Sequence, residues 1–276
     1  MSAQEPPVRA PSFRLSILES RALAELGAFV ATSPFLRVAG RGDRHPVLVL
    51  PGFMADDRST VPLRWTLRNQ GYWVHGWRLG TNIPTQARLD GLRDRLSDLY
   101  QRHGNPVSLV GWSLGGILAR ELARETPHQV RQVITLGSPF RLRGNDRSSI
   151  TEFVDSLDLE MVDSLSAQPP EQDRPPLPVP STAIYSRTDG VIRWHVCIDE
   201  AGPWRENIEV RGSHSGLGHN PAVVVAISDR LSRPINRWAP FRPPLGIRYL
   251  YPRPVEWHSR IEESVSAPPA TVRSRL

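Results

Sequence analysis

Lysine is absent from this sequence, because all 34 of its basic residues are arginine. Schiff-base catalysis, the attachment of pyridoxal phosphate and the phosphate-binding P-loop each require a lysine amine. These three kinds of chemistry are therefore excluded. The arginines are spread along the chain among 28 acidic residues, so the formal net charge of +6 is not gathered into the basic runs typical of nucleic-acid-binding proteins. We expect no nucleic-acid partner.

Cysteine and long apolar runs are scarce as well. The single cysteine, Cys197, cannot form a disulfide within the chain, and we interpret it as a buried free thiol. No stretch reaches the roughly 18 consecutive apolar residues of a membrane span, and the N-terminus has no charged-then-apolar signal pattern. We therefore expect a soluble, cytoplasmic protein without a membrane span.

The length of the chain, 276 residues, suits one large α/β domain. From Pro46 onward, short apolar runs alternate with amphipathic helices, which is typical of a mostly parallel sheet covered on both faces. We predict strands at residues 46–51, 71–79, 107–111, 132–136, 181–186 and 207–211. We predict helices at residues 61–69, 86–102, 114–125 and 221–231, the last of them capped by Asn220.

The predicted core, residues 46–140 and 181–232, is flanked by two extensions. Residues 1–45 contain Leu15, Leu18, Leu23, Leu26, Phe29 and Val30 at helical spacing, which predicts a helix packed on the body. A helix lying on a membrane surface is the alternative, which Glu19 and Glu25 disfavour. Residues 233–276 are rich in proline, arginine and aromatic residues, and we expect their end to be disordered.

The C-terminal extension leaves a second interpretation open. Aromatic side chains alternate there with Arg242, Arg248 and Arg253, a pattern that also occurs in arms that bind single-stranded nucleic acid or a partner protein. Segments of this kind more often wrap against their own domain. We favour that interpretation.

The strongest functional signal is Gly-Trp-Ser-Leu-Gly at residues 111–115, which follows an apolar strand and opens a helix. A nucleophile at the tip of such a turn sits in strained backbone, and the residues two before and two after it must be nearly free of side chain. Gly111 and Gly115 meet that requirement. The pattern predicts a nucleophile elbow with Ser113 as the nucleophile.

A serine hydroxyl needs a histidine to remove its proton and an acid to orient that histidine. Asp189 follows the fifth predicted strand and His214 follows the sixth, which gives the chain order serine, acid, histidine. Asp199 and His219 are the alternatives for the two roles. The remaining histidines show no paired metal-ligand spacing, so we expect no metal.

Negative charge that develops on a carbonyl oxygen needs backbone N–H donors already in place. Leu114 lies in the first turn of the helix after the nucleophile, and we expect it to supply one donor. The second donor is expected from Phe53, in the Pro-Gly-Phe-Met loop that follows the first predicted strand. Together the two N–H groups form the predicted oxyanion hole.

These residues together resemble the α/β-hydrolase superfamily, most closely bacterial serine lipases and carboxylesterases, over residues 46–231. The resemblance implies an eight-stranded, mostly parallel sheet with a cap after the sixth strand. It also implies hydrolysis of small-molecule or lipid esters through an acyl-enzyme, without a cofactor. Two departures stand out: many lipases carry His-Gly where this chain has Pro51-Gly52, and histidine before the nucleophile where it has Trp112.

Residues 141–180 match the position of that cap and are longer than an ordinary connection. Ser149 and Glu152 form a capping-box pattern that opens a helix whose apolar residues, Phe153, Leu157 and Met161 among them, share one face. We predict a helical lid over an apolar acyl pocket. A helix packed permanently in the core is the alternative.

Two other functions share this pattern. An acyltransferase would form the same acyl-enzyme at Ser113 and pass the acyl group to an alcohol. A non-catalytic interaction protein would keep the fold without needing Ser113, Asp189 and His214 at three separate strand ends. Ester hydrolysis is the interpretation we favour.

Overall fold

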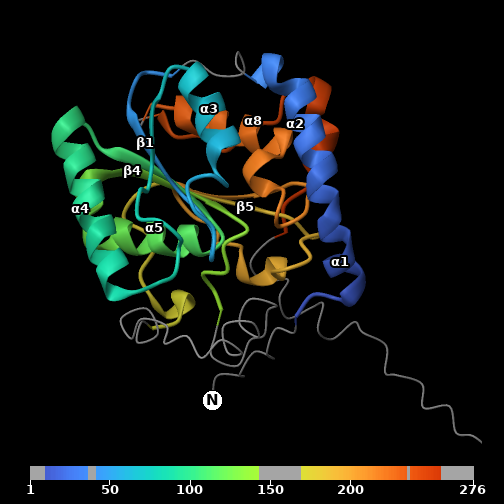
Figure 1. The fold of residues 1–276 in the computed structure, drawn as a ribbon, viewed down its shortest axis with the longest axis horizontal. Helices are drawn as coiled ribbons and strands as arrows, with labels where there is room; N and C mark the ends of the chain where they lie inside the picture. Colours follow the sequence, from blue (N-terminus) through green and yellow to red (C-terminus); the bar gives the residue numbers. More distant parts are fainter. Residues whose placement is uncertain (1–9, 37–41, 143–168, 235–236, 256–276) are drawn as a thin grey trace, which may run out of the picture.

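The computed structural model describes residues 10–36, 42–142, 169–234 and 237–255. Its centre is a six-stranded sheet with the strand order β2-β1-β3-β4-β5-β6 (Figure 1). Every neighbouring pair of strands is parallel. The strands are β1 (Pro46–Leu50), β2 (Trp73–Gly76), β3 (Val107–Trp112), β4 (Val130–Leu136), β5 (Ser181–Tyr185) and β6 (Arg205–Glu209).

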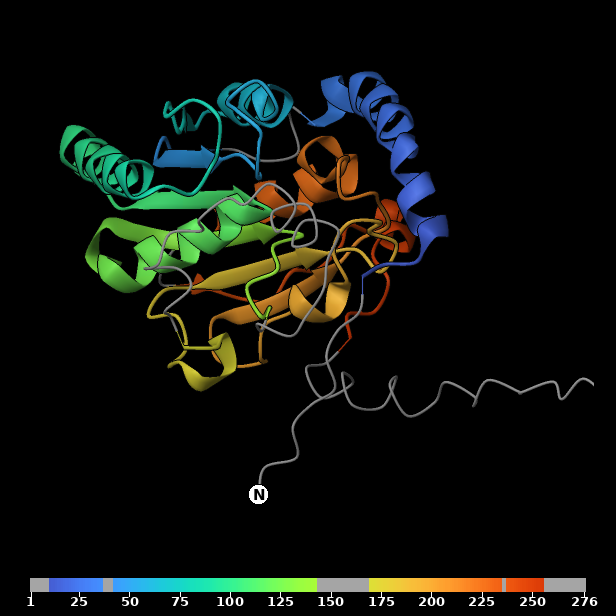
Figure 2. The same ribbon diagram turned by 60° about the horizontal axis from the view of Figure 1, so that its bottom comes forward.

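Helices cover both faces of the sheet, as Figure 2 shows. One face carries α2 (Ala22–Leu36), α3 (Val61–Asn69) and α8 (Pro221–Ser232), and the other carries α4 (Gln86–His103) and α5 (Leu114–Glu125). In β1, Val47 and Val49 pack toward the first group of helices while Leu48 and Leu50 pack toward the second. A strand covered on both sides must be apolar at every position, which explains the continuous apolar run in the sequence.

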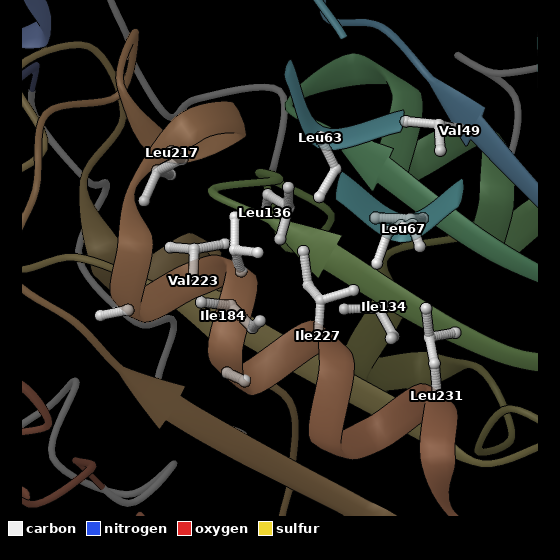
Figure 3. Close-up of a cluster of buried hydrophobic side chains, with 14 of the residues drawn as sticks. Val49, Leu63, Leu67, Ile134, Leu136, Ile184, Leu217, Val223, Ile227 and Leu231 are labelled. Carbon is white, nitrogen blue, oxygen red and sulfur yellow. The ribbon is translucent and has the colours of Figure 1, made fainter. Parts of the chain in front are cut away.

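The larger core cluster lies between the sheet and helices α3 and α8 (Figure 3). Leu63 and Leu67 of α3 and Ile227 of α8 contact the sheet there, and each is at most 1% exposed. Full burial of one such side chain contributes about 1.5–3 kcal/mol. The packed sheet therefore gives a rigid base to the loops that follow its strands.

The predicted strands and helices of the core are confirmed, with bounds that differ by a few residues at their ends. Asn220 caps α8, because its side chain accepts hydrogen bonds from the backbone N–H groups of Ala222 and Val223. The eight strands implied by the resemblance are not all present in the described part of the chain, which contains six. The resemblance implies a cap after the sixth strand, whereas the long insertion follows the fourth strand, β4. The numbering differs because the described residues before β1 form helices instead of strands.

The N-terminal helix forms, but the face it turns to the body differs from the expectation. Residues 13–36 form α1 (Phe13–Ile17), the short 3-10 helix η1 (Leu18–Arg21) and α2. Phe29 and Leu36 are buried, whereas Leu23 and Val30 are 78% and 64% exposed. Polar contacts between this segment and the loops that follow β5 and β6 fix this orientation.

Phe153, Leu157 and Met161 lie outside the described residues, so the lid stays a prediction. In the C-terminal extension, residues 237–255 pack on the body: Tyr251 is buried and its hydroxyl donates to the carbonyl of Ala222 at 2.8 Å. The last ten or so residues, which we expect to be disordered, also lie outside the described part. Cys197 is a buried free thiol. No helix in the described ranges is long and apolar enough to cross a membrane.

Candidate active site

The turn from β3 into α5 holds Ser113 in a strained conformation. Its backbone has φ 52° and ψ −121°, in a region that residues with a side chain rarely adopt. A Cβ atom at Gly115 would lie 2.6 Å from the carbonyl oxygen of Leu50, and one at Gly111 would overlap the carbonyl of Gly115. Only glycine at these two positions lets strand and helix approach so closely.

Ser113 is 2% exposed, and its Oγ has no hydrogen-bond partner among the described residues. The side chain lines a cavity of about 270 Å³. The other residues around this cavity are Gly52, Phe53, Ala55, Trp112, Val191, His214 and Ser215. The fold therefore brings Ser113 and His214 to one cavity, together with the predicted oxyanion loop.

His214 forms a buried pair with Asp189. Its Nδ1 lies 2.6 Å from Oδ2 of Asp189, and the two residues are 7% and 4% exposed. The other carboxylate oxygen of Asp189 accepts hydrogen bonds from the backbone N–H groups of Val191 and Ile192, at 2.8 and 2.7 Å. This arrangement assigns the proton to Nδ1 of His214 and leaves Nε2 as the basic nitrogen.

The backbone of Gly137, just after β4, presses against this pair. A Cβ atom there would lie 3.1 Å from Nδ1 of His214 and 3.2 Å from Oδ2 of Asp189, and the residue has φ 54°. A left-handed backbone and a close approach both call for glycine. The loops after β4, β5 and β6 therefore meet around one hydrogen bond.

The charge around His214 favours its protonated form. Burial lowers the pKa of His214, but the Asp189 carboxylate and, less strongly, Glu19 raise it by more, so the pKa lies above its ordinary value. Such an imidazole is a stronger base than a free histidine. It is suited to accepting a proton from a hydroxyl.

The two alternative residues are engaged elsewhere. His219 donates from its Nε2 to the carbonyl oxygen of Ala22 at 3.0 Å. Asp199 forms an ion pair with the buried Arg120, whose Nη1 lies 2.8 Å from the Asp199 carboxylate. The structure thus brings Asp189 together with His214 and holds Asp199 and His219 in other contacts.

The predicted oxyanion loop follows β1 and passes close to Ser113. A Cβ atom at Gly52 would lie 3.3 Å from Cβ of Ser113, and Phe53 lines the same cavity. Leu114 is the first residue of α5, so no residue of its own helix can accept from its N–H. The two predicted donors therefore lie in segments that flank the nucleophile.

No family model matches the chain. A curated relative, the pimeloyl-[acyl-carrier protein] methyl ester esterase of Shewanella woodyi, is 29% identical over 109 residues. The match covers 38% of this chain and 41% of that protein, so the chain spans less than half of the relative's length.

Solved lipases share the architecture. Lipase B of Aspergillus fumigatus aligns with a TM-score of 0.51 and 17% identity over 71% of this chain and 54% of that one. The lipase BlEst2 of Bacillus licheniformis aligns with a TM-score of 0.52 and 16% identity over 70% of this chain and 93% of that one. The chain has the α/β-hydrolase fold. The resemblance inferred from the sequence is thereby confirmed for the fold.

Within this α/β-hydrolase fold, Asn82 is a residue that sequence reasoning missed. It is fully buried, and its side-chain amide donates to the carbonyl of Pro51 at 2.7 Å. Its backbone carbonyl accepts from Met54 N–H at 2.9 Å, and its own N–H donates to Ala55 at 2.8 Å. Asn82 therefore holds the loop that carries Phe53. The surrounding sequence gives no signal of this role.

Trp112, one of the two departures from common lipase sequences, also contacts the site. Its indole N–H donates to the backbone carbonyl of His214 at 3.1 Å. Its ring packs so closely on Gly218 that a Cβ atom there would lie 2.7 Å from it. The residue before the nucleophile therefore supports the loop that carries His214.

Proposed function

We propose that this protein is a carboxylic ester hydrolase in which Ser113 is the nucleophile, His214 the general base and Asp189 the acid that orients it. The observation that carries the proposal is one cavity lined by a strained serine, whose hydroxyl has no hydrogen-bond partner in the described part of the chain, and by a histidine bound to a buried carboxylate. This is the constellation required for acyl transfer through a serine. The lipases that share the fold and the esterase that is similar in sequence over 109 residues support the same reaction class.

The reaction follows from these roles. Nε2 of His214 takes the hydroxyl proton while Oγ of Ser113 bonds to the ester carbonyl carbon, whose π electrons move to the oxygen. The N–H groups of Leu114 and Phe53 stabilise that oxyanion. Collapse breaks the bond to the alcohol oxygen, which leaves with the proton from His214. Water then attacks the acyl-enzyme by the same steps, and the acid and the free serine are released.

The lining of the cavity points to an apolar acyl group. Phe53, Trp112 and Val191 supply apolar surface beside the nucleophile, within a volume of about 270 Å³. Burial of each methylene on such surface contributes about 0.8 kcal/mol. We therefore propose small-molecule or lipid esters with apolar acyl chains as substrates.

A series of chromogenic esters of increasing acyl length tests this function. The expected result is saturable hydrolysis by the purified protein, with kcat/KM rising from acetyl to medium chains. The absence of hydrolysis across the whole series would refute the proposed function. Hydrolysis with no dependence on chain length would refute the apolar acyl pocket alone.

Replacing Asp189 with asparagine is expected to lower kcat by about 10³- to 10⁴-fold, less than loss of the base itself. An asparagine oxygen can still accept from Val191 and Ile192, but its amide then donates toward Nδ1 of His214. That contact selects the tautomer whose Nε2 carries the proton and cannot accept one from Ser113. Steady-state kinetics on one ester checks this, and a loss below tenfold would argue against the role of Asp189.

The activity should depend on pH through His214. Because the base must be neutral to accept the serine proton, kcat/KM rises as the pH passes the pKa of His214. Asp189 and Glu19 raise that pKa above the ordinary histidine value in spite of burial, so the midpoint is expected above about pH 6.5. A kcat/KM profile from about pH 5 to 9 checks this. A midpoint below the ordinary value would contradict the electrostatics described here.

A further inference from the structure

The segment of residues 13–36 crosses the end of the sheet at which β5 and β6 finish, as Figure 2 shows. There it meets two loops that belong to the candidate site. The Asp189 loop comprises residues 186–192, and the His214 loop comprises residues 210–216. The contacts between this segment and the two loops are polar, and most of them are made by backbone atoms of the loops.

Glu19 of η1 joins the two loops. Its Oε1 accepts hydrogen bonds from the backbone N–H groups of Gly190 at 2.8 Å and His214 at 2.9 Å. Its Oε2 accepts from the N–H of Ser215 at 2.9 Å. One carboxylate thus binds the residue after the acid, the base itself and the residue after the base.

Neighbouring side chains extend this junction. Ser16 donates to the carbonyl of Gly190 at 3.0 Å, and Arg21 donates to the carbonyls of Gly212, at 3.0 Å, and Thr188. Glu25 accepts from the N–H of Ser213 at 2.8 Å. The helical segment therefore binds both loops at several points along its length.

The loops are shaped to receive this segment. A Cβ atom at Gly190 would overlap the carbonyl of Leu15, and one at Gly216 would overlap the carboxylate of Glu25. Neither glycine has a positive φ, so at Gly190 the close approach of the Leu15 backbone, and not the backbone conformation, requires glycine. The two loops and the helical segment pack as one unit around Glu19.

We infer that Glu19 is a positioning residue for the reaction. By tying the backbone of the Asp189 loop to that of the His214 loop, it fixes the distance and direction of the hydrogen bond between the two side chains. This inference rests on the proposed function, because it concerns the geometry of the proposed acid and base. Glu19 is not among the residues that line the cavity, and its side chain reaches the site through the backbone N–H groups of His214 and Ser215.

Charge gives Glu19 a second, measurable effect on His214. Burial raises the pKa of Glu19, but the N–H groups of Ser215, His214 and Gly190 lower it by more, so the carboxylate is ionised at neutral pH. Its negative charge adds to that of Asp189 in raising the pKa of His214. Among the described residues, the other charged or titratable groups of the two loops and of the elements packed on them include Arg21, Glu25, Arg187, Cys197, Arg211 and His219.

Glu19→Gln tests both effects at nearly constant shape. The amide keeps one accepting oxygen but turns its NH₂ toward a backbone N–H, and the negative charge is lost. We expect the plateau kcat to fall about 10- to 100-fold with little change in KM, as for a misplaced catalytic group. We also expect the acid limb of the kcat/KM profile to move to lower pH, because the imidazolium loses a stabilising charge.

Two matched variants serve as controls. Glu25→Gln removes an acid from the same segment. Asp189 and Glu19 are the acids that raise the pKa of His214, so the Glu25 variant should leave the acid limb in place. Asp98→Asn removes an exposed acid from α4 and should leave both kcat and the acid limb unchanged. An unchanged kcat and acid limb in Glu19→Gln would overturn the inference, and so would an equal shift in all three variants.

A measurement without turnover separates this inference from the proposed function. Titration of the His214 imidazole by NMR, assigned by its absence in His214→Gln, should give a lower pKa in Glu19→Gln than in the parent protein. If the parent hydrolyses no ester, the proposed function fails while this titration still reports on Glu19. If Glu19→Gln does not fold, Glu19→Asp keeps the charge on a shorter side chain. It should then lower kcat without moving the acid limb, and an unchanged kcat would overturn the inference.

Discussion

Ser113→Ala is expected to lower kcat/KM for ester hydrolysis by about 10⁴- to 10⁶-fold. The substitution removes the only atom proposed to bond to the substrate carbon. It breaks no hydrogen bond among the described residues, because Oγ of Ser113 has no partner there. A buried hydroxyl without a partner does not stabilise the fold, so Tm should stay the same or rise. A large loss of activity with an intact Tm is therefore expected.

Ser108→Ala is the matched control for this variant. Ser108 is also a buried serine and lies on β3, but its side chain bonds to His45 and Gln132, away from the cavity. Loss of the Ser108 hydroxyl should lower Tm and change kcat/KM by no more than a few-fold. Ser113→Ala should do the opposite and lower kcat/KM without lowering Tm. Residual hydrolysis by Ser113→Ala near the parent rate would remove Ser113 from the mechanism.

His214→Ala should be nearly as damaging as loss of the nucleophile, with a fall in kcat of about 10⁴- to 10⁶-fold. His219→Ala should lower kcat by less than about tenfold, because the one side-chain hydrogen bond it breaks among the described residues is that to the Ala22 carbonyl. Both are measured on the same ester at a pH above the midpoint of the profile. His214→Gln, which keeps a donor for Asp189, controls for the burial of an unpaired carboxylate. If the His219 variant were the inactive one, His219 would be the base.

Patterns local in sequence predicted most of the fold. The alternation of apolar runs and amphipathic helices placed β3 and α5 on either side of Ser113, because burial on both faces of a strand leaves a continuous apolar run. Gly111 and Gly115 could be read directly, since a tight turn between strand and helix has few solutions. Asp189 and His214 followed from their positions after successive strands.

The supporting residues could not be predicted because their partners are distant in sequence. Glu19 reaches Gly190 and His214 across more than 170 residues, and Asn82 reaches Pro51 from a loop without a motif. Helical periodicity alone assigned Leu23 and Val30 to the packed face, yet the polar contacts of Glu19 and Glu25 turn those side chains to solvent. The predicted residues of the lid lie outside the described part of the chain and stay a prediction.

Labelling with a fluorophosphonate tests the central claim, that Ser113 is a nucleophile activated by His214, most directly. Such a reagent bonds covalently to a serine that an adjacent base has activated. Mass spectrometry of the digested protein should find one adduct, on the peptide that contains Ser113. Labelling should be absent in Ser113→Ala and much slower in His214→Gln. An unlabelled Ser113 in a protein that hydrolyses esters, or an adduct that persists in Ser113→Ala, would contradict the claim.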